Sequence, residues 1–157
     1  MSESDRFGGW SIDQKVFGWI LSNLQVGSQI LELGSGWATG ELSRYYRMHS
    51  IEDSINWVNK YDSHYIYAPG NGWYDMAVLD QELGRIDYNL FIIDGPENFQ
   101  RQRIVDNARV FNWAVPVIID DCQEPHIMQA AETIAKDFCK RPSFLITGEQ
   151  KKAMVIP

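Results

Sequence analysis

The chain has 157 residues, of which 45% are hydrophobic, and this composition suits one domain over residues 1–157 with a buried core. Its formal net charge of −7 is unfavourable for binding a negatively charged phosphate backbone, so nucleic acid is not an expected partner. With two isolated cysteines, no leader-like start and no apolar run near the roughly 20 residues of a membrane helix, we expect a cytoplasmic protein without a membrane segment.

The amino-terminal part is predicted to hold a loose segment and one helix. Residues 1–10 are polar and contain glycine, and we expect them to be flexible or to fold as a lid over a ligand. A helix is expected over residues 11–26, because apolar residues recur there at helical intervals. Ser11 and Gln14 have the spacing of a capping box at the start of this helix, and Gly27 follows its end.

The segment after this helix carries the strongest functional pattern. An apolar strand is predicted over residues 29–33, and it passes directly into Gly34, Ser35 and Gly36. Glycines at this place allow the backbone to turn tightly, so that free N–H groups face a ligand. The pattern therefore predicts a nucleotide-binding turn between a strand and a helix.

Two acids add specificity to this turn. Glu32 lies near the end of the first strand, and Glu52 ends the next predicted strand, twenty residues further on. In a strand–helix–strand unit the second acid falls at the tip of the neighbouring strand, where it can accept hydrogen bonds from ribose hydroxyls. The pair therefore predicts a cofactor that contains a nucleoside.

The rest of the chain alternates between helical and strand-like segments. Alternation of this kind indicates crossover connections and a parallel sheet that helices cover on both faces. The last two strands are separated by too few residues for a helical crossover, so we expect them to form a hairpin. The expected elements are helices over 39–46, 54–60, 75–83, 98–111 and 125–139, and strands over 48–52, 64–67, 88–94, 115–120, 143–147 and 153–156.

The segment Glu32-x-Gly34-x-Gly36 resembles the first motif of the class I S-adenosylmethionine-dependent methyltransferases, and residues 50–54 resemble their second motif. The resemblance extends over nearly the whole chain. It implies an α/β fold of three layers, with a seven-stranded, mostly parallel sheet in the order 3-2-1-4-5-7-6 whose last strand is antiparallel.

The resemblance also implies how single residues hold S-adenosylmethionine. We expect the glycine turn to lie against the methionine part of the cofactor, with the ammonium near Glu32 or its neighbouring carbonyls and the ribose on Glu52. Trp73 and Tyr74 are expected either to stack on the adenine or to pack the following helix onto the sheet. The implied cofactor-binding residues are Glu32, Gly34, Ser35, Gly36, Glu52, Asp53, Trp73, Tyr74 and Asp94.

Further acids follow the two central strands. Asp94, Asp120 and Asp121 are expected to point toward the crevice in which ligands lie in open α/β sheets. Their segments resemble those of the caffeoyl-coenzyme A and catechol O-methyltransferases, in which such acids hold a divalent cation, commonly Mg²⁺. Oxygen ligands suit such a cation, but the further amide ligand of those relatives has no clear match after Asp121. The three acids are therefore the candidate metal ligands.

Without a metal, the same acids have other roles open to them. Asp94 or Asp121 can serve as a general base or can only orient the substrate. His126 is another candidate base, and the alternative is that it is an ordinary residue at the start of a helix. Asp94, Asp121 and His126 are thus the candidate catalytic residues.

The resemblance implies methyl transfer to a small-molecule acceptor, with oxygen preferred to nitrogen, in a pocket that is open or is closed by a second copy in a homodimer. The signature Asn/Asp-Pro-Pro-Tyr/Phe is missing, which argues against methylation of adenine or cytosine. Two alternatives stay open. One is a module that binds the cofactor without catalysis. The other is an NAD(P)-dependent oxidoreductase, because Gly34-x-Gly36-x-x-x-Gly40 also resembles a pyridine-nucleotide fingerprint, although the chain lacks the accompanying Tyr-x-x-x-Lys.

Overall fold

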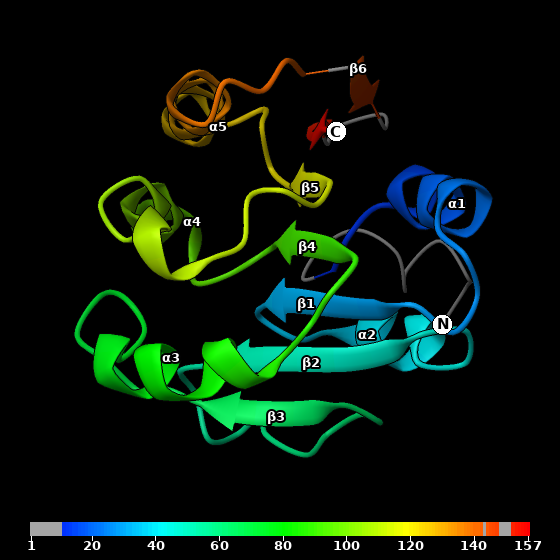
Figure 1. The fold of residues 1–157 in the computed structure, drawn as a ribbon, viewed down its shortest axis with the longest axis vertical. Coiled ribbons are helices and arrows are strands. Elements are labelled where there is room, and N and C mark those ends of the chain that lie inside the picture. The colour runs from blue at the N-terminus through cyan, green and yellow to red at the C-terminus, as the bar shows by residue number, and fades with distance from the viewer. Residues whose placement is uncertain (1–10, 143, 148–151) are drawn as a thin grey trace.

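A computed structural model describes residues 11–142, 144–147 and 152–157. The expected lid over residues 1–10 lies outside the described residues. The described strands form one sheet in the order β3-β2-β1-β4-β5-β7-β6, which runs upward from β3 at the bottom of Figure 1. The strands are β1 (Gln29–Leu33), β2 (Arg47–Glu52), β3 (His64–Tyr67), β4 (Leu90–Ile93), β5 (Val117–Ile119), β6 (Phe144–Thr147) and β7 (Lys152–Ile156).

Parallel pairing joins β3, β2, β1, β4 and β5, whereas β7 is antiparallel to both of its neighbours, β5 and β6. Each parallel pair needs a crossover, and most of these connections contain a helix or helical turns. The expected α/β class and mostly parallel sheet are confirmed. The carboxyl ends of β1, β2, β4 and β5 therefore meet at one edge of the sheet, where the site lies.

Helices cover both faces of the sheet (Figure 1), so that the molecule has three layers. The helices α1 (Gln14–Asn23) and α2 (Trp37–Leu42) contribute to one apolar cluster, together with the outward residues of β1 and β4 on that face. On the other face lie α3 (Met76–Glu82), α4 (Asn98–Arg101) and α5 (Pro125–Asp137). No helix among the described residues combines the length and the apolar character that crossing a bilayer demands.

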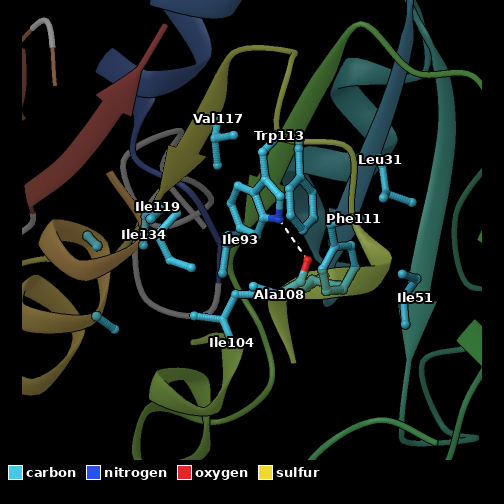
Figure 2. Packing of buried hydrophobic residues seen from close by; sticks show 14 of the residues in the cluster. Leu31, Ile51, Ile93, Ile104, Ala108, Phe111, Trp113, Val117, Ile119 and Ile134 are labelled. Carbon is cyan, nitrogen blue, oxygen red and sulfur yellow. Dashed lines mark hydrogen bonds between the residues drawn. The ribbon is translucent and has the colours of Figure 1, made fainter. Parts of the chain in front are cut away.

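The larger apolar cluster lies between the sheet and the helices α3 and α5. Figure 2 shows Phe111 and Trp113, from the loop before β5, packed into this cluster beside Ala108. The ring of Phe111 stacks on Phe91 of β4 at 4.8 Å between centroids. Trp113 Nε1 donates a hydrogen bond to the carbonyl oxygen of Ala108 at 2.7 Å, which satisfies its one polar group inside the core. This packing fixes the loop that leads into β5.

The amino-terminal helix begins later than the capping-box spacing predicts. Asp13 caps α1, because its side chain accepts a hydrogen bond from Lys15 N at 2.7 Å. The hydroxyl of Ser11 instead accepts a hydrogen bond from Ala38 N at 3.0 Å. Ser11 thus ties the start of the described chain to α2, and the predicted role of Ser11 as a cap is wrong.

Two predicted helices are also wrong in extent. Residues 54–60 form turns, and Asn59 adopts φ +61, a left-handed conformation that does not continue a helix. The predicted helix over 98–111 is interrupted: α4 is followed by short 3₁₀ turns at Gln102–Ile104 and Ala108–Val110. Arg103 O accepts hydrogen bonds both from the side chain of Asn107 at 2.8 Å and from Asn107 N at 3.2 Å, so side chain and backbone share one acceptor.

Candidate functional site

A cavity of about 590 Å³ lies at the carboxyl ends of the parallel strands. Its lining comes from the turn after β1, the end of β2, the loop after β4 and Asp121, which follows β5. This is the edge where open α/β sheets bind their ligands. Of the residues that were predicted as cofactor ligands, Gly34, Ser35, Glu52, Asp53, Tyr74 and Asp94 line the cavity.

The turn after β1 is packed directly against the turn after β4. Gly34 has φ +77, and a Cβ atom on it would lie 3.2 Å from the Cα of Gly95. A Cβ atom on Gly95 would in turn lie 2.9 Å from the Cα of Gly34 and 2.6 Å from the hydroxyl of Tyr74. Both positions therefore require glycine, the first for its conformation and both for space. The result is a floor of bare backbone on this side of the cavity.

Glu52 lies against the turn after β1, as its position at the end of β2 predicts. One of its carboxylate oxygens accepts hydrogen bonds from Ser35 N at 2.5 Å and from Ser35 Oγ at 2.6 Å. Burial raises the pKa of Glu52, and the two bonds from Ser35 act in the opposite direction. The predicted contact between the glycine turn and this acid is therefore confirmed.

Glu32 faces the opposite side of the sheet, under α2. Its carboxyl group accepts hydrogen bonds from Thr39 Oγ1 at 2.7 Å and from Ser50 Oγ at 2.5 Å. Thr39 Oγ1 in turn accepts a hydrogen bond from Gly36 N at 2.9 Å. Because it is buried, the pKa of Glu32 is raised to about 8.

This network places two of the predicted cofactor-binding residues away from the cavity. Among the described residues, neither Glu32 nor Gly36 belongs to the cavity lining, so the expected contact of Glu32 with the ammonium of the cofactor is not part of this geometry. Alternation along β1 explains the difference, because Leu31 and Leu33 face the larger apolar cluster and Glu32 faces the other side. Glu32 and Gly36 instead stabilise the turn through their hydrogen bonds with Thr39.

The aromatic residues of the cavity differ from those predicted. Trp73 is only 5% exposed and belongs to the larger apolar cluster, so it packs in the core, whereas Tyr74 lines the cavity. Trp57 also lines the cavity, and Lys60 Nζ lies 3.8 Å from the centre of its ring. Trp57 was missed because residues 54–60 were predicted as a helix. Its position shortly after Glu52 was the available signal.

The three carboxylates after β4 and β5 come together as predicted. Asp94, Asp120 and Asp121 each place one oxygen within 4.8 Å of the others. Asp94 and Asp121 line the cavity, whereas Asp120 is fully buried behind it. Arg101 Nη1 lies 2.8 Å from Asp121 Oδ2, and Arg101 Nη2 lies 3.6 Å from Asp94 Oδ1. Because a guanidinium already contacts two of the three acids, this donor set does not fit a divalent cation as it stands.

Arg101 is the second functional residue that sequence reasoning missed. It lies at the end of α4 and is 4% exposed, and arginine is almost never buried to this degree unless it is paired. Nothing in the sequence pairs it with acids that lie seven and twenty positions away, apart from the rule that such a charge needs a partner.

His126 lies outside the cavity. Its ring stacks on that of Phe99 with 5.8 Å between centroids, and it lines a second, more open groove beside α5. Phe99 itself lines the cavity and is 85% exposed. The structure therefore places His126 behind Phe99 and gives its predicted role as a base no direct support.

The charge of the cavity is strongly negative. The acids Glu52, Asp53, Asp94, Glu97 and Asp121 line it, and Arg101 is the one basic residue among the described lining residues. Since Arg101 is already engaged with Asp94 and Asp121, the field left for a ligand favours positive charge.

No protein-family model matches this chain, and neither does any curated protein. Among solved structures, an O-methyltransferase from Bacillus cereus in complex with SAH superposes with a TM-score of 0.66 at 14% identity, over 98% of this chain and 85% of that chain. A precorrin-6y C5,15-methyltransferase from Geobacter metallireducens gives a TM-score of 0.64 at 13% identity, over 98% and 94%. A precorrin 8W decarboxylase from Methanobacterium thermoautotrophicum gives 0.59 at 13% identity, over 99% and 95%.

These identities are low, so the likeness shows a shared fold. That fold is the one of the class I S-adenosylmethionine-dependent methyltransferases, as the two sequence motifs predicted.

Proposed function

We propose that the protein binds S-adenosylmethionine in the cavity and transfers its methyl group to a small-molecule acceptor, with oxygen preferred to nitrogen. The observation that carries the proposal is the contact between Ser35 and Glu52, at 2.5 and 2.6 Å, which joins the glycine turn to the acid at the tip of β2. When bound, this cofactor supplies a methyl group on a positively charged sulfonium.

The residues around the cavity suit the parts of that cofactor. The bare backbone of Gly34 and Gly95 allows close approach of the methionine part, and Glu52 presents a carboxylate to the ribose. Trp57 and Tyr74 offer aromatic surfaces for the adenine. The acidic lining favours a ligand with net positive charge, which supports a sulfonium compound over a pyridine dinucleotide with its phosphates.

For the transfer itself, positioning is the main task of the protein, because an aligned nucleophile and methyl group need little further chemistry. Asp94 and Asp121 line the same cavity after the ends of β4 and β5. There they can orient a hydroxyl or amine acceptor and accept a hydrogen bond from it. Phe99, exposed on the same lining, can contact a flat acceptor.

Calorimetry with S-adenosylhomocysteine beside NADP⁺ tests the cofactor. We expect S-adenosylhomocysteine to bind and Glu52→Gln to weaken it about 10- to 100-fold, because a charged hydrogen bond contributes about 1.5–3 kcal/mol. The matched control is Glu82→Gln, which alters a carboxylate on α3 that pairs with Arg85 at the surface and lies away from the cavity. Binding of NADP⁺ alone would overturn the proposal.

Turnover separates an enzyme from a binding module. We expect S-adenosylhomocysteine to be released when S-adenosylmethionine is mixed with at least one member of a panel of hydroxylated aromatics and amines. Asp94→Asn should lower this rate while the affinity for S-adenosylhomocysteine changes less. Tight binding without turnover across the panel would favour the non-catalytic module instead.

A further inference from the structure

The acids that follow β4 and β5 form a concentrated negative charge inside the protein. Asp120 has no exposed surface, Asp121 is 7% exposed, and Asp94 is half-buried. Carboxylates this close, within 4.8 Å of one another, need a counter-charge to remain ionised in a buried place. Either a bound cation or a basic side chain can supply it, and the two solutions make different predictions.

Arg101 supplies the counter-charge with all of its donor groups. Its Nε donates to Pro96 O at 3.3 Å, and its Nη1 donates to Asp121 Oδ2 at 2.8 Å and to Asp120 O at 3.4 Å. Its Nη2 donates to Asp94 O at 2.6 Å and lies 3.6 Å from Asp94 Oδ1. Four of the five N–H groups of the guanidinium thus make hydrogen bonds, and the fifth belongs to Nη2, which lies 3.6 Å from Asp94 Oδ1. Arg101 is therefore largely engaged by groups of the protein itself.

A divalent cation would compete with the guanidinium in this arrangement. A cation bound to Asp121 Oδ2 would take the carboxylate oxygen that Arg101 Nη1 contacts, and would place two positive charges next to each other. Moving the guanidinium aside would break its bonds to two backbone carbonyls beside the cavity, Asp94 O and Pro96 O. The loop that carries Asp94 would then lose these two hydrogen bonds.

We propose that Arg101 is the permanent counter-cation of this acidic cluster, so that the cluster binds no divalent cation and methyl transfer needs none. Arg101 is a positioning residue: it holds the loop after β4 and keeps Asp94 and Asp121 oriented at the cavity. The statement about transfer rests on the proposed function, whereas the statement about cation binding does not.

Cation titration of the full chain is the direct test. We expect no saturable heat when Mg²⁺ or Mn²⁺ is titrated to millimolar concentration, with or without S-adenosylhomocysteine. Saturable binding to the unaltered protein that disappears in Asp121→Asn would overturn the proposal. Because the readout is cation binding, this result stands whether or not the cofactor binds.

Removal of the guanidinium supplies the complementary test. Arg101→Met keeps most of the side-chain length and removes the charge, so we expect the melting temperature to fall by about 10 °C. Without their counter-charge, the acids of the cluster should then respond to metal, and Mn²⁺ should restore about half of that loss. Arg109→Met is the matched control, because Arg109 pairs with Asp80 on the exposed surface, and it should change neither quantity.

If Arg101→Met does not fold, Arg101→Lys gives the answer. It keeps a positive charge with fewer donors, so we expect a smaller fall in melting temperature and still no response to Mn²⁺. An Arg101→Met protein that is as stable as its parent, or a parent whose methyl transfer is abolished by EDTA and restored by Mg²⁺, would overturn the proposal.

Discussion

The two halves of the sheet edge satisfy their acids in different ways. Around β1 and β2, Glu32 and Glu52 are held by neutral donors, the hydroxyls of Thr39 and Ser50 and the N–H and hydroxyl of Ser35. Around β4 and β5, the acids are held by the full positive charge of Arg101. Neutral donors leave a carboxyl group free to take up a proton, whereas a guanidinium keeps its partners ionised. The stability contributed by the β1–β2 half should therefore depend on pH, whereas that of the β4–β5 half should depend on the charge pairing with Arg101.

The largest expected effect is the pH dependence that Glu32 confers on stability. Its pKa is about 8 in the folded protein and has an ordinary value of 4.5, so between these values the folded state keeps a proton that the unfolded state releases. Stability is therefore greatest at low pH in this window and falls by about 1.4 kcal/mol per pH unit as the pH rises toward 8. Urea unfolding at pH 5, 6, 7 and 8 measures the slope.

Glu32→Gln removes the contribution of Glu32 to this slope, while the amide oxygen of the new side chain still accepts hydrogen bonds from Thr39 and Ser50. A smaller slope of the same sign should remain, because burial also raises the pKa of Glu52. Glu82→Gln, on the partly exposed surface of α3, should leave the parent slope unchanged. Equal slopes in Glu32→Gln and the parent would show that Glu32 is ionised in the folded state.

The next effect comes from the other half. Asp121→Ala leaves Arg101 without its 2.8 Å partner, and we expect a loss of about 3 kcal/mol in the free energy of unfolding. Asp121 also has φ +59, a conformation that Asn tolerates better than Ala. Asp121→Asn should therefore lose less than Asp121→Ala, because Asn suits this backbone conformation and its amide oxygen can still accept a hydrogen bond from Arg101.

The contrast with a surface pair checks this assignment. Asp80→Asn removes the partner of Arg109 at 3.2 Å, where both side chains are well exposed, and should cost no more than about 0.5 kcal/mol. Similar losses in Asp80→Asn and Asp121→Ala would contradict a special role for the buried pair.

The turns of the two halves pack against each other where Gly34 lies against Gly95. Gly95→Ala would place a Cβ atom 2.9 Å from the backbone of Gly34, so we expect a loss of about 2 kcal/mol and weaker binding of S-adenosylhomocysteine. Gly84→Ala has no atom within 4 Å of its new methyl group and should be neutral or slightly stabilising. Unfolding curves and calorimetry on the two variants give both readings.

The sequence predicted what local pattern controls. The strand ending at Glu52, the glycine turn and the order of the strands follow from apolar periodicity and from the resemblance, and the structure has them in those places, whereas two of the predicted helices are absent or interrupted. The side of the sheet to which Glu32 points was not predictable, because β1 is buried on both faces and its pattern lacks a polar side. The partner of Arg101 was not predictable either, since it depends on how α4 packs over two other loops.

Trp57 shows the third kind of miss, and it leads to the smallest expected effect. Its segment was predicted to be helical, but the left-handed Asn59 ends any helix there and leaves Trp57 on the cavity lining. If this ring stacks on the adenine, Trp57→Leu should weaken S-adenosylhomocysteine binding by about 1 kcal/mol or slightly more, while Trp57→Phe retains most of the affinity. Trp73→Phe, in the core, should reduce stability and leave affinity nearly unchanged. If affinity were instead lost in Trp73→Phe and kept in Trp57→Leu, the adenine would not lie against Trp57 on the side of the cavity next to Glu52. The acidic lining would then be the main support for a sulfonium ligand.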